Sequence, residues 1–379
     1  MPKIERVLIV GAGIAGLSLA IALKRQGLNP EIVERQAALP TYGAGIYLVG
    51  NAMRALGSLN LDDPVLRQGA LIQTQTLLDD RGRTLATINT ESVWASCGPC
   101  VGIRRVDLQS ILVEALGAAQ LHFSTTVAAL EQRENFVAVQ FSNGTEGHYD
   151  LVVGADGVRS SIRKLVFGDL QPRYCGQVGW RFLVSCPPSI TGWTVFAGHR
   201  GVFLFVPVGS GQAYCYADAV IAQPLDDPLE GRLERLRSRF GSYASPVPEA
   251  LAELQSSEQI HFAAIEDILQ EPWASGRVLL IGDAAHATSP NMASGAAMAL
   301  EDALVLSKLI ASERDVTQVL DEYMTQRMPR IRWVHEQTHR RDQIRNLPPL
   351  IRNIMTRYLA NSVYRANYTP LIAELSESN

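Results

Sequence analysis

The chain has 379 residues, of which 47% are hydrophobic, and this composition excludes a disordered protein. Its 34 Lys and Arg residues against 38 Asp and Glu residues give a net charge of −4, which excludes the strongly basic character of nucleic-acid-binding proteins. It contains no apolar run of about 18 residues, and its odd number of five cysteines fits a reducing compartment, so we expect a cytoplasmic protein with small-molecule partners, no nucleic acid and no membrane.

The start of the chain predicts a parallel α/β unit. Residues 7–10 form an apolar run that ends in glycine, and apolar residues then recur at helical spacing as far as Gly27. The segment "PEIVER" predicts a second strand, which completes a strand-helix-strand unit. Alternating residues with a turn at "DDRGR", a helix at "VDLQSILVEALG" and a buried strand at "YDLVVGADG" follow.

The second half of the chain changes character twice. Residues 171–262 are rich in β-branched and aromatic residues at alternating spacing, which predicts an antiparallel sheet. The segment "RVLLIGDAAH" then restores a buried parallel strand. We therefore expect an α/β fold in which a Rossmann-like cofactor-binding domain of residues 1–70, 101–170 and 276–316 is interrupted by a mostly antiparallel substrate-binding sheet domain of residues 71–100 and 171–275, with a helical C-terminal segment of residues 317–379.

The glycines of "GAGIAG" have the spacing of a dinucleotide-binding loop between a strand and a helix. Gly11 permits the tight turn, Gly13 lets the backbone approach a pyrophosphate, and Gly16 allows close packing of the helix on the strand. Glu34 follows at the end of the second strand, about 20 residues on, where a carboxylate accepts both ribose hydroxyls of an adenosine. The motif predicts a bound dinucleotide but does not separate NAD from FAD.

Four further segments distinguish FAD from NAD. The segments "ERQ", "RRVDL", "GADGVRSSIR" and "GDAAHATSPNMASGAAMALEDA" stand in an order and spacing that resemble the single-component FAD-dependent aromatic hydroxylases, the p-hydroxybenzoate hydroxylase-like group A flavoprotein monooxygenases. The resemblance covers nearly the whole chain. It departs from the family at Ala293-Ser294-Gly295, where the family usually has Gly-Gln-Gly.

The resemblance implies that the cofactor is FAD, with Arg35 near the adenine and Arg105 near the diphosphate. Asp283 follows a buried strand, where its carboxylate can bind the ribityl hydroxyls. The helix that begins near Ser294 offers free N–H groups and a positive dipole end to the charge of reduced flavin. The full set of predicted cofactor contacts is Gly11, Gly13, Ala15, Gly16, Glu34, Arg35, Gly45, Arg105, Val127, Asp156, Gly282, Asp283, Gly295, Ala296 and Ala297.

The resemblance also implies the reaction. No second glycine fingerprint appears between residues 150 and 300, so NADH or NADPH is expected to bind transiently, across a cleft shaped by Asp156 and Gly157. The nicotinamide would reduce FAD, O2 would form a C4a-hydroperoxyflavin, and its distal oxygen would pass to an aromatic or heteroaromatic, phenol-like small molecule with or without a carboxylate. We expect a monomer or a homodimer.

Four residues are predicted to serve the substrate. Tyr216 is the first choice for contact with a substrate hydroxyl, and the resemblance places Tyr47 beside the flavin ring. Arg181 can bind a substrate carboxylate as a bidentate fork. Pro290 precedes the predicted flavin helix, where its carbonyl can contact substrate or the oxygen intermediate, or fix only the local conformation.

Two alternatives to this function stay open. One is a flavoprotein of the same fold that acts as an oxidase, or as an epoxidase on a non-aromatic or polyketide-like substrate. The other is a flavin disulfide oxidoreductase that uses Cys97 and Cys100 of "CGPC", although the residues after them do not predict the helix that lowers a thiol pKa. A zinc site at His335 and His339 of "HEQTH" is disfavoured by the neighbouring arginines, and no metal is predicted.

Overall fold

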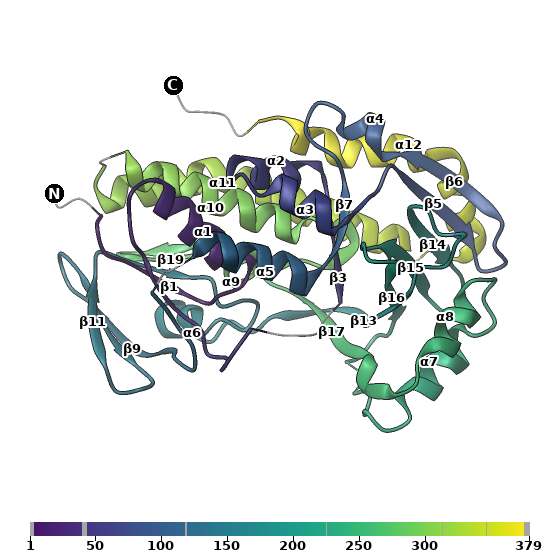
Figure 1. The fold of residues 1–379 in the computed structure, drawn as a ribbon, viewed down its shortest axis with the longest axis horizontal. Coiled ribbons are helices and arrows are strands. Elements are labelled where there is room, and N and C mark those ends of the chain that lie inside the picture. Colours follow the sequence, from purple (N-terminus) through teal and green to yellow (C-terminus); the bar gives the residue numbers. More distant parts are fainter. Residues whose placement is uncertain are drawn as a thin grey trace.

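A six-stranded, mostly parallel sheet forms one half of the molecule (Figure 1). The computed structural model describes residues 4–39, 44–117, 120–224, 226–312, 314–345 and 347–374. The strand order is β18-β19-β12-β1-β2-β8, and only β18 runs antiparallel to its neighbour. Its central strands are buried on both faces, as a parallel sheet covered by helices requires. The strands are β1 Val7–Val10, β2 Glu31–Val33, β8 Gln120–His122, β12 Leu151–Gly154, β18 Ala274–Ser275 and β19 Val278–Leu280.

Glycine allows the first helix to lie close to this sheet. A Cβ at Gly16 would stand 1.9 Å from the carbonyl oxygen of Gly11, and Gly11 itself has a φ of +109°. Helix α1 then packs against α5 and α10. The helices of this half are α1 Ile14–Arg25, α2 Gly50–Ser58, α3 Asp62–Gln68, α5 Arg105–Leu116, α6 Ser161–Phe167, α9 Asp283–His286 and α10 Gly295–Ala311.

A seven-stranded sheet forms the other half, in the order β17-β13-β16-β15-β14-β5-β6. All neighbours are antiparallel except the pair β14 and β5. One face packs on two helices, α7 Arg232–Phe240 and α8 Val247–Glu253. The strands are β5 Thr74–Asp79, β6 Thr84–Asn89, β13 Arg173–Ser185, β14 Trp193–Ala197, β15 Val202–Pro207, β16 Gln212–Val220 and β17 His261–Asp267.

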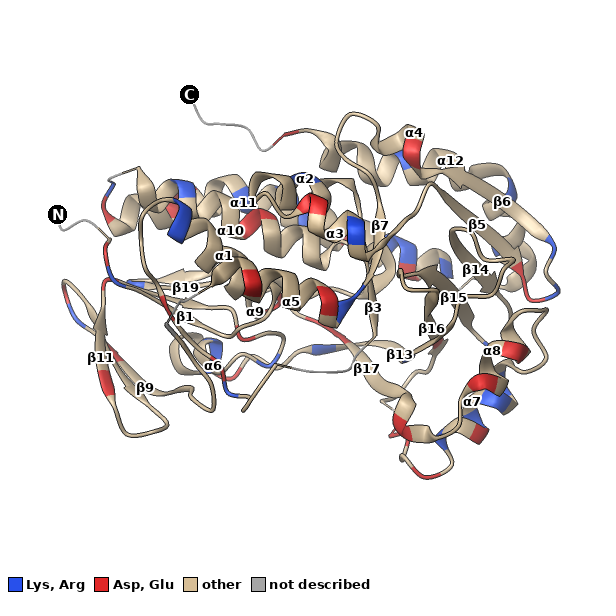
Figure 2. Ribbon diagram, viewed as in Figure 1, with Lys and Arg blue, Asp and Glu red and all other residues tan. Residues whose placement is uncertain are grey.

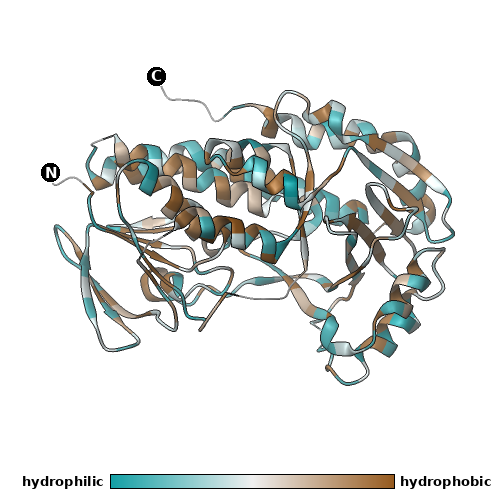
Figure 3. Ribbon diagram, in the orientation of Figure 1, coloured by the Kyte–Doolittle hydropathy of each residue, from teal (hydrophilic) through white to brown (hydrophobic). Residues whose placement is uncertain are grey.

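Two small antiparallel sheets complete the strands. One has the order β3-β7-β4 and lies between the halves, and the other has the order β11-β10-β9. Charges of both signs are spread over the molecule (Figure 2), whereas the strands of the two large sheets are mostly apolar (Figure 3). The strands of the two small sheets are β3 Gly45–Leu48, β4 Ala70–Leu71, β7 Val101–Arg104, β9 Val127–Gln132, β10 Val137–Phe141 and β11 Glu146–Tyr149.

Two long helices end the described chain, α11 Val316–Arg345 and α12 Pro349–Ile372. Pro348 and Pro349 stand at the start of α12, because proline disfavours helical continuation but suits the first turn of a helix. Helix α12 packs on β6, α2 and α4 Thr90–Trp94 (Figure 1). Within the described ranges no helix has the length and apolar character that crossing a bilayer demands.

The predicted fold class is confirmed by these elements: a Rossmann-like parallel sheet, a mostly antiparallel sheet and a helical C-terminus. The seven-stranded sheet takes two strands from residues 74–89 and five from residues 173–267. The division of the chain into domains at the predicted boundaries stays a prediction.

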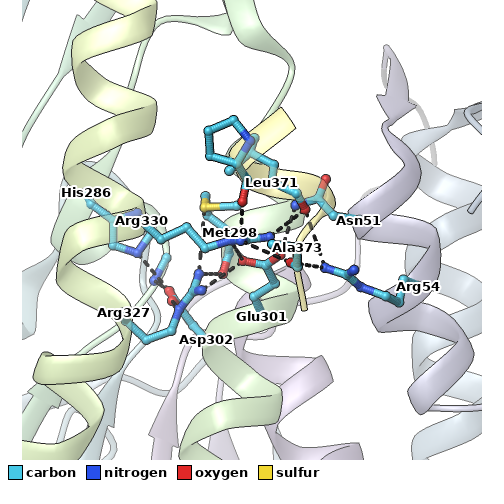
Figure 4. A network of polar contacts seen from close by, with 12 residues as sticks. Asn51, Arg54, His286, Met298, Glu301, Asp302, Arg327, Arg330, Leu371 and Ala373 are labelled. Atoms are coloured by element: carbon cyan, nitrogen blue, oxygen red, sulfur yellow. Dashed lines mark hydrogen bonds and ion pairs between the residues drawn. The ribbon is translucent and has the colours of Figure 1, made fainter. Parts of the chain in front are cut away.

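A buried network of charges holds α11 against α10 (Figure 4). Glu301 and Asp302 of α10 are buried, and Arg327 of α11 lies between them, 2.8 Å from a carboxylate oxygen of each. Arg330 donates two more hydrogen bonds to Glu301, each of 2.8 Å. Although burial raises the pKa of Asp302, His286 and Arg327 lower it well below its usual range.

The same network reaches two distant parts of the chain. Asp302 accepts the backbone N–H of Gly282 at 2.9 Å and lies 2.7 Å from the ring nitrogen Nε2 of His286, which fixes the turn after β19. Arg330 donates to the carbonyls of Pro370 and Leu371 at the end of α12. These carbonyls have no partner within the helix, so arginine caps the C-terminus of α12.

The "HEQTH" side chains have separate partners. The Nε2 atom of His335 donates to the carbonyl oxygen of His286 at 3.1 Å, and His339 lies 2.8 Å from a carboxylate oxygen of Asp267. Burial lowers the pKa of His335 to about 4. Among the described residues, no three His, Cys, Asp or Glu side chains are grouped to hold a metal ion.

We predict that Arg327→Met lowers the free energy of unfolding by about 3–5 kcal/mol, because it leaves two buried carboxylates without their shared partner. Urea unfolding followed by tryptophan fluorescence measures the loss. The control is Arg332→Met, which removes an exposed ion pair with Glu271 and is expected to leave the urea midpoint unchanged. Equal effects of the two substitutions would contradict the role of the network.

His335 is predicted to make the protein sensitive to acid. Its folded pKa of about 4 lies below the unfolded value of about 6.5, so its stabilising contribution is full above pH 6.5 and is lost as the pH falls toward 4. The loss amounts to roughly 3 kcal/mol. Unfolding free energies of wild type and His335→Asn at pH 7 and at pH 4.5 test this, with exposed His148→Asn as control. The difference between the two pH values should shrink only in His335→Asn.

Candidate active site

A cavity of about 680 Å³ lies where the two large sheets meet. Its walls come from the loop after β1, the first turn of α10, one face of the seven-stranded sheet, and α12. Eleven of the predicted site residues line it, namely Gly13, Ala15, Gly45, Tyr47, Arg105, Arg181, Tyr216, Asp283, Pro290, Gly295 and Ala296. Segments from distant parts of the sequence therefore meet at one site.

Two helix N-termini face this cavity without a side-chain cap. Gly13 precedes α1 and Ser294 precedes α10, and neither position makes a side-chain cap hydrogen bond. The hydroxyl of Ser294 donates instead to the carbonyl of Met292. The backbone N–H groups of both first turns are therefore available, and together with the helix dipoles they suit anionic ligand groups.

The surroundings of these two turns fit the diphosphate and ribityl parts of FAD. A Cβ at Gly13 would meet no atom within 4 Å, so the backbone is open to a close ligand. Arg105 and Asp283 are both exposed and both line the cavity, the first as a cation and the second as a carboxylate without a protein hydrogen bond in the described part of the chain. The cavity thus offers an anion-binding site, formed by the two helix N-termini and Arg105, and a hydroxyl acceptor, the carboxylate of Asp283.

Glu34 lies behind the glycine loop rather than in the cavity. Its carboxylate accepts the backbone N–H groups of Ala12 and Gln36, both at 2.9 Å, and it retains further lone pairs for a ribose. Arg35 is exposed beside it. Val127 is buried at the start of β9, two residues after Thr125, whose N–H donates to the carbonyl of Glu34.

Other predicted cofactor residues have structural contacts. The carboxylate of Asp156 accepts hydrogen bonds from Ser160, Ser161 and the N–H of Ile162, so it caps α6 instead of facing a cleft as predicted. Gly282 has a φ of +57° and holds the turn before Asp283. Ala297 is fully buried in the core below the first turn of α10.

Strand alternation separates the cavity face of the large sheet from its other face. On β15, Val202, Leu204 and Val206 line the cavity, whereas Phe203 and Phe205 pack under α7 and α8. Leu77, Ile88 and Val195 extend the same aliphatic wall. This half of the cavity is therefore apolar apart from a few side chains.

Arg181 is the main cation of the apolar half. Its guanidinium lies over the ring of Tyr216 at 5.3 Å and within hydrogen-bonding reach of Tyr214, and no carboxylate pairs with it among the described residues. The hydroxyl of Tyr216 is buried on the side of Arg345, and its contact with a substrate hydroxyl stays a prediction. Burial raises the pKa of Tyr216.

A second polar cluster holds the loop before α10, which includes Pro290. The carboxylate of Asp342 accepts hydrogen bonds from Ser289 and Asn291, and Arg341 donates to the carbonyl oxygen of Asn291 at 2.8 Å. Arg345 forms a buried ion pair with Asp218 beside them. Helix α11 therefore fixes the loop that leads into the first turn of α10.

Sequence reasoning missed several lining residues. Tyr47 stacks edge-on against Trp193, with ring centroids 4.5 Å apart, and accepts a hydrogen bond of 3.4 Å from Gln75. The signal for Trp193 and Gln75 lay in the alternation of β14 and β5. Nothing in the sequence placed α12 here, and it contributes Met355, Thr356, Leu359, Ala360, Val363 and Tyr364.

The "CGPC" pair lacks the features of a reactive dithiol. Cys97 follows the C-terminal end of α4 rather than an N-terminal helix end. Cys100 is buried, and burial raises its pKa to about 12. Because the thiolate is the nucleophile, neither position favours disulfide exchange.

Comparisons with known proteins agree with this geometry. A family model described as "FAD binding domain" matches residues 5–338. Aurachin C monooxygenase/isomerase of Stigmatella aurantiaca is 34% identical over 327 residues, covering 86% of this chain and 85% of that protein. The 2-heptyl-3-hydroxy-4(1H)-quinolone synthase of Pseudomonas aeruginosa is 31% identical, covering 88% and 87%.

A solved structure extends the comparison to the whole fold. The structure of Klebsiella pneumoniae HpxO complexed with FAD and uric acid has a TM-score of 0.89 and 26% identity, and covers 98% of both chains. FAD-dependent urate hydroxylase of Klebsiella pneumoniae is 30% identical, covering 86% of this chain and 87% of that one. By its sequence, its fold and the two helix N-termini at its cavity, this chain belongs to the family of FAD-dependent aromatic hydroxylase-like monooxygenases.

Proposed function

We propose that this chain, with FAD bound and NADH or NADPH as the electron donor, uses O2 to hydroxylate a phenol-like heteroaromatic ring that carries an apolar substituent. The observation that carries this proposal is one cavity bordered by two uncapped helix N-termini and by an aliphatic wall beside Arg181, which has no carboxylate partner among the described residues. Relatives named for a heptyl quinolone and for urate support a heteroaromatic substrate. The aliphatic wall of the cavity favours a heteroaromatic substrate that carries an alkyl group.

The residues at the anion-binding end would hold the cofactor. The first turns of α1 and α10 would bind the diphosphate and the flavin, Arg105 would neutralise phosphate charge, and Asp283 would accept the ribityl hydroxyls. When bound, FAD would accept a hydride from the nicotinamide and activate oxygen. The protein's own tasks are to position the substrate ring and to exclude water.

Arg181 would perform the positioning. A guanidinium near a phenol-type hydroxyl stabilises the anion, and the more electron-rich anionic ring attacks an electrophilic oxygen better. The rings of Tyr47, Trp193 and Tyr216 suit the faces and edges of a planar substrate. The side chains of Leu204, Val206 and α12 keep the site dry, which protects a reactive oxygen species from water.

The alternatives from the sequence receive less support. A disulfide oxidoreductase needs a thiolate, and the Cys100 pKa of about 12 opposes one. An oxidase or epoxidase of the same fold would bind FAD at the same end of the cavity. Only the substrate end can therefore distinguish it from a hydroxylase. Arg181 has no carboxylate partner among the described residues, and its pairing with an ionisable ring would favour hydroxylation.

Anaerobic flavin reduction by NADH and NADPH tests the proposal, with a panel of hydroxylated quinolones, hydroxybenzoates and purines as effectors. We expect a ring with an apolar substituent to accelerate reduction at least about tenfold. Arg181→Leu should lose most of that acceleration, whereas Arg200→Leu, at an exposed turn position that does not line the cavity, should keep it. Equally fast reduction without any effector would contradict a substrate-gated hydroxylase.

Asp283→Ala is predicted to weaken FAD binding by about tenfold or more, because it removes charge-assisted hydrogen bonds to the ribityl chain. Titration of the apoprotein with FAD, followed by flavin fluorescence, gives the dissociation constant. Asp63→Ala, at an exposed position of α3, is the matched control. An unchanged FAD affinity in Asp283→Ala would remove Asp283 from the cofactor site.

A further inference from the structure

Exposed apolar side chains gather on one short stretch of α12. Twelve large hydrophobic residues are exposed in the described chain, and five of them lie within residues 350–359. Figure 3 shows apolar positions alternating with polar ones along this helix. The five are Leu350, Ile351, Ile354, Tyr358 and Leu359, with exposed fractions of 73%, 48%, 52%, 76% and 45%. Scattered single apolar residues are ordinary on a surface, but a cluster of this kind calls for a partner.

Four of these side chains share one side of the helix, and we call these four, Leu350, Ile351, Ile354 and Tyr358, the apolar stripe. Leu350, Ile354 and Tyr358 follow one another at intervals of four residues, and Ile351 stands seven residues before Tyr358. At 3.6 residues per turn these positions lie on the same face. The stripe is therefore a continuous surface about two turns long, and not a set of separate contacts.

The helix that carries the apolar stripe borders the cavity. Leu359 is half-exposed and also lines the cavity, and Met355 lies one turn before it on the cavity wall. Helix α12 thus directs one face to solvent and the opposite face into the cavity. Leu359, on the cavity side, is an apolar side chain in contact with both solvent and the cavity.

The charge of α12 is of one sign. The helix contains Arg352, Arg357 and Arg365 and no Asp or Glu (Figure 2). Arg357 and Arg365 are exposed, while Arg352 donates to the carbonyl of Gly198. Arg340, near the end of α11, is also exposed. The helix that carries the apolar stripe is therefore positively charged although the whole chain has a net charge of −4.

We propose that the apolar stripe of α12 docks onto an anionic lipid surface, with the apolar side chains among the acyl chains and the arginines at the headgroups. Anionic headgroups complement the exposed arginines, and amphipathic helices of this composition lie in the membrane interface. A second copy of the chain would place these arginines against each other. The expectation of no membrane rested on the lack of a spanning segment, which does not bear on a helix that lies on the surface.

The docked position gives the cavity a lipid-facing mouth at Leu359. An alkylated ring dissolved in the bilayer would then reach the cavity without crossing water. This consequence rests on the proposed function, whereas the lipid contact itself does not. A failure of the hydroxylase assay and a failure of vesicle binding are therefore separate results.

Co-sedimentation of the FAD-loaded full chain with vesicles tests the proposal. We expect binding to phosphatidylcholine vesicles that contain phosphatidylglycerol, weaker binding to pure phosphatidylcholine, and a fall in binding as salt rises, because headgroup attraction is screened. Absence of binding to the anionic vesicles would overturn the proposal. Binding that is the same for both vesicle types would also overturn it.

Two double variants locate the contact. Ile354→Asp with Tyr358→Asp is expected to reduce vesicle binding at least about tenfold, since it removes two apolar side chains and adds two negative charges. Leu165→Asp with Leu229→Asp makes the same charge change at exposed apolar positions outside α12 and should retain binding beyond the small effect of net charge. Flavin absorbance and the thermal unfolding midpoint report that each variant is folded.

Reduction of bound flavin by the nicotinamide, with a water-soluble effector and without vesicles, should be unchanged in the α12 variant, because neither residue lines the cavity. Light scattering after size exclusion measures the oligomeric state. A dimer that Ile354→Asp with Tyr358→Asp converts to monomer would overturn the proposal and make this face a contact between copies. Equal loss of vesicle binding in both double variants would overturn it as well.

Discussion

The pairing of two adjacent buried carboxylates in α10 determines how the rest of the molecule is assembled. Glu301 and Asp302 stand in the middle of a helix whose first turn lies at the cavity, and neither could be buried without cationic partners. Arg327 and Arg330 supply those partners from α11. Because Arg330 also caps the end of α12, the ion pairs that neutralise α10 place the final helix over the site.

The same charges fix the cofactor end of the cavity. Asp302 accepts the N–H of Gly282, the residue before Asp283, so the position of Asp283 depends on a side chain two turns into α10 and not on local turn geometry alone. Asp342, Arg341 and Arg345 of α11 hold the loop that contains Pro290. Helix α11 therefore holds two segments in place, the turn before Asp283 and the loop that contains Pro290.

The local motifs could be predicted from sequence because each is set by short-range geometry. The glycine loop, Glu34, and the first turn of α10 follow from spacing, φ angles and strand ends, and the structure brings Gly13, Asp283 and Gly295 to one cavity. The contribution of α12 could not be predicted, because it depends on Arg330, which contacts Glu301 29 positions earlier and Pro370 40 positions later in the chain.

The direction in which polar side chains point could not be predicted from the sequence either. Alternation placed Tyr214 and Tyr216 on one face of β16, but the hydroxyl of Tyr216 turns toward Arg345, which comes from a helix 129 positions later in the chain. Asp156 likewise stands where the family motif places it, yet its carboxylate binds the first turn of α6. A strand pattern gives the face of a residue, whereas the partner of its polar end is set by tertiary packing.

The most direct test of the account is the source of the oxygen in the product. The FAD-loaded enzyme would be supplied with NADH or NADPH, the ring that best accelerates flavin reduction, and ¹⁸O2 in unlabelled water, and the product analysed by mass spectrometry. A monooxygenase incorporates a single labelled oxygen atom into each hydroxylated ring. An unlabelled product, or hydrogen peroxide formed in place of any hydroxylated ring, would contradict the account.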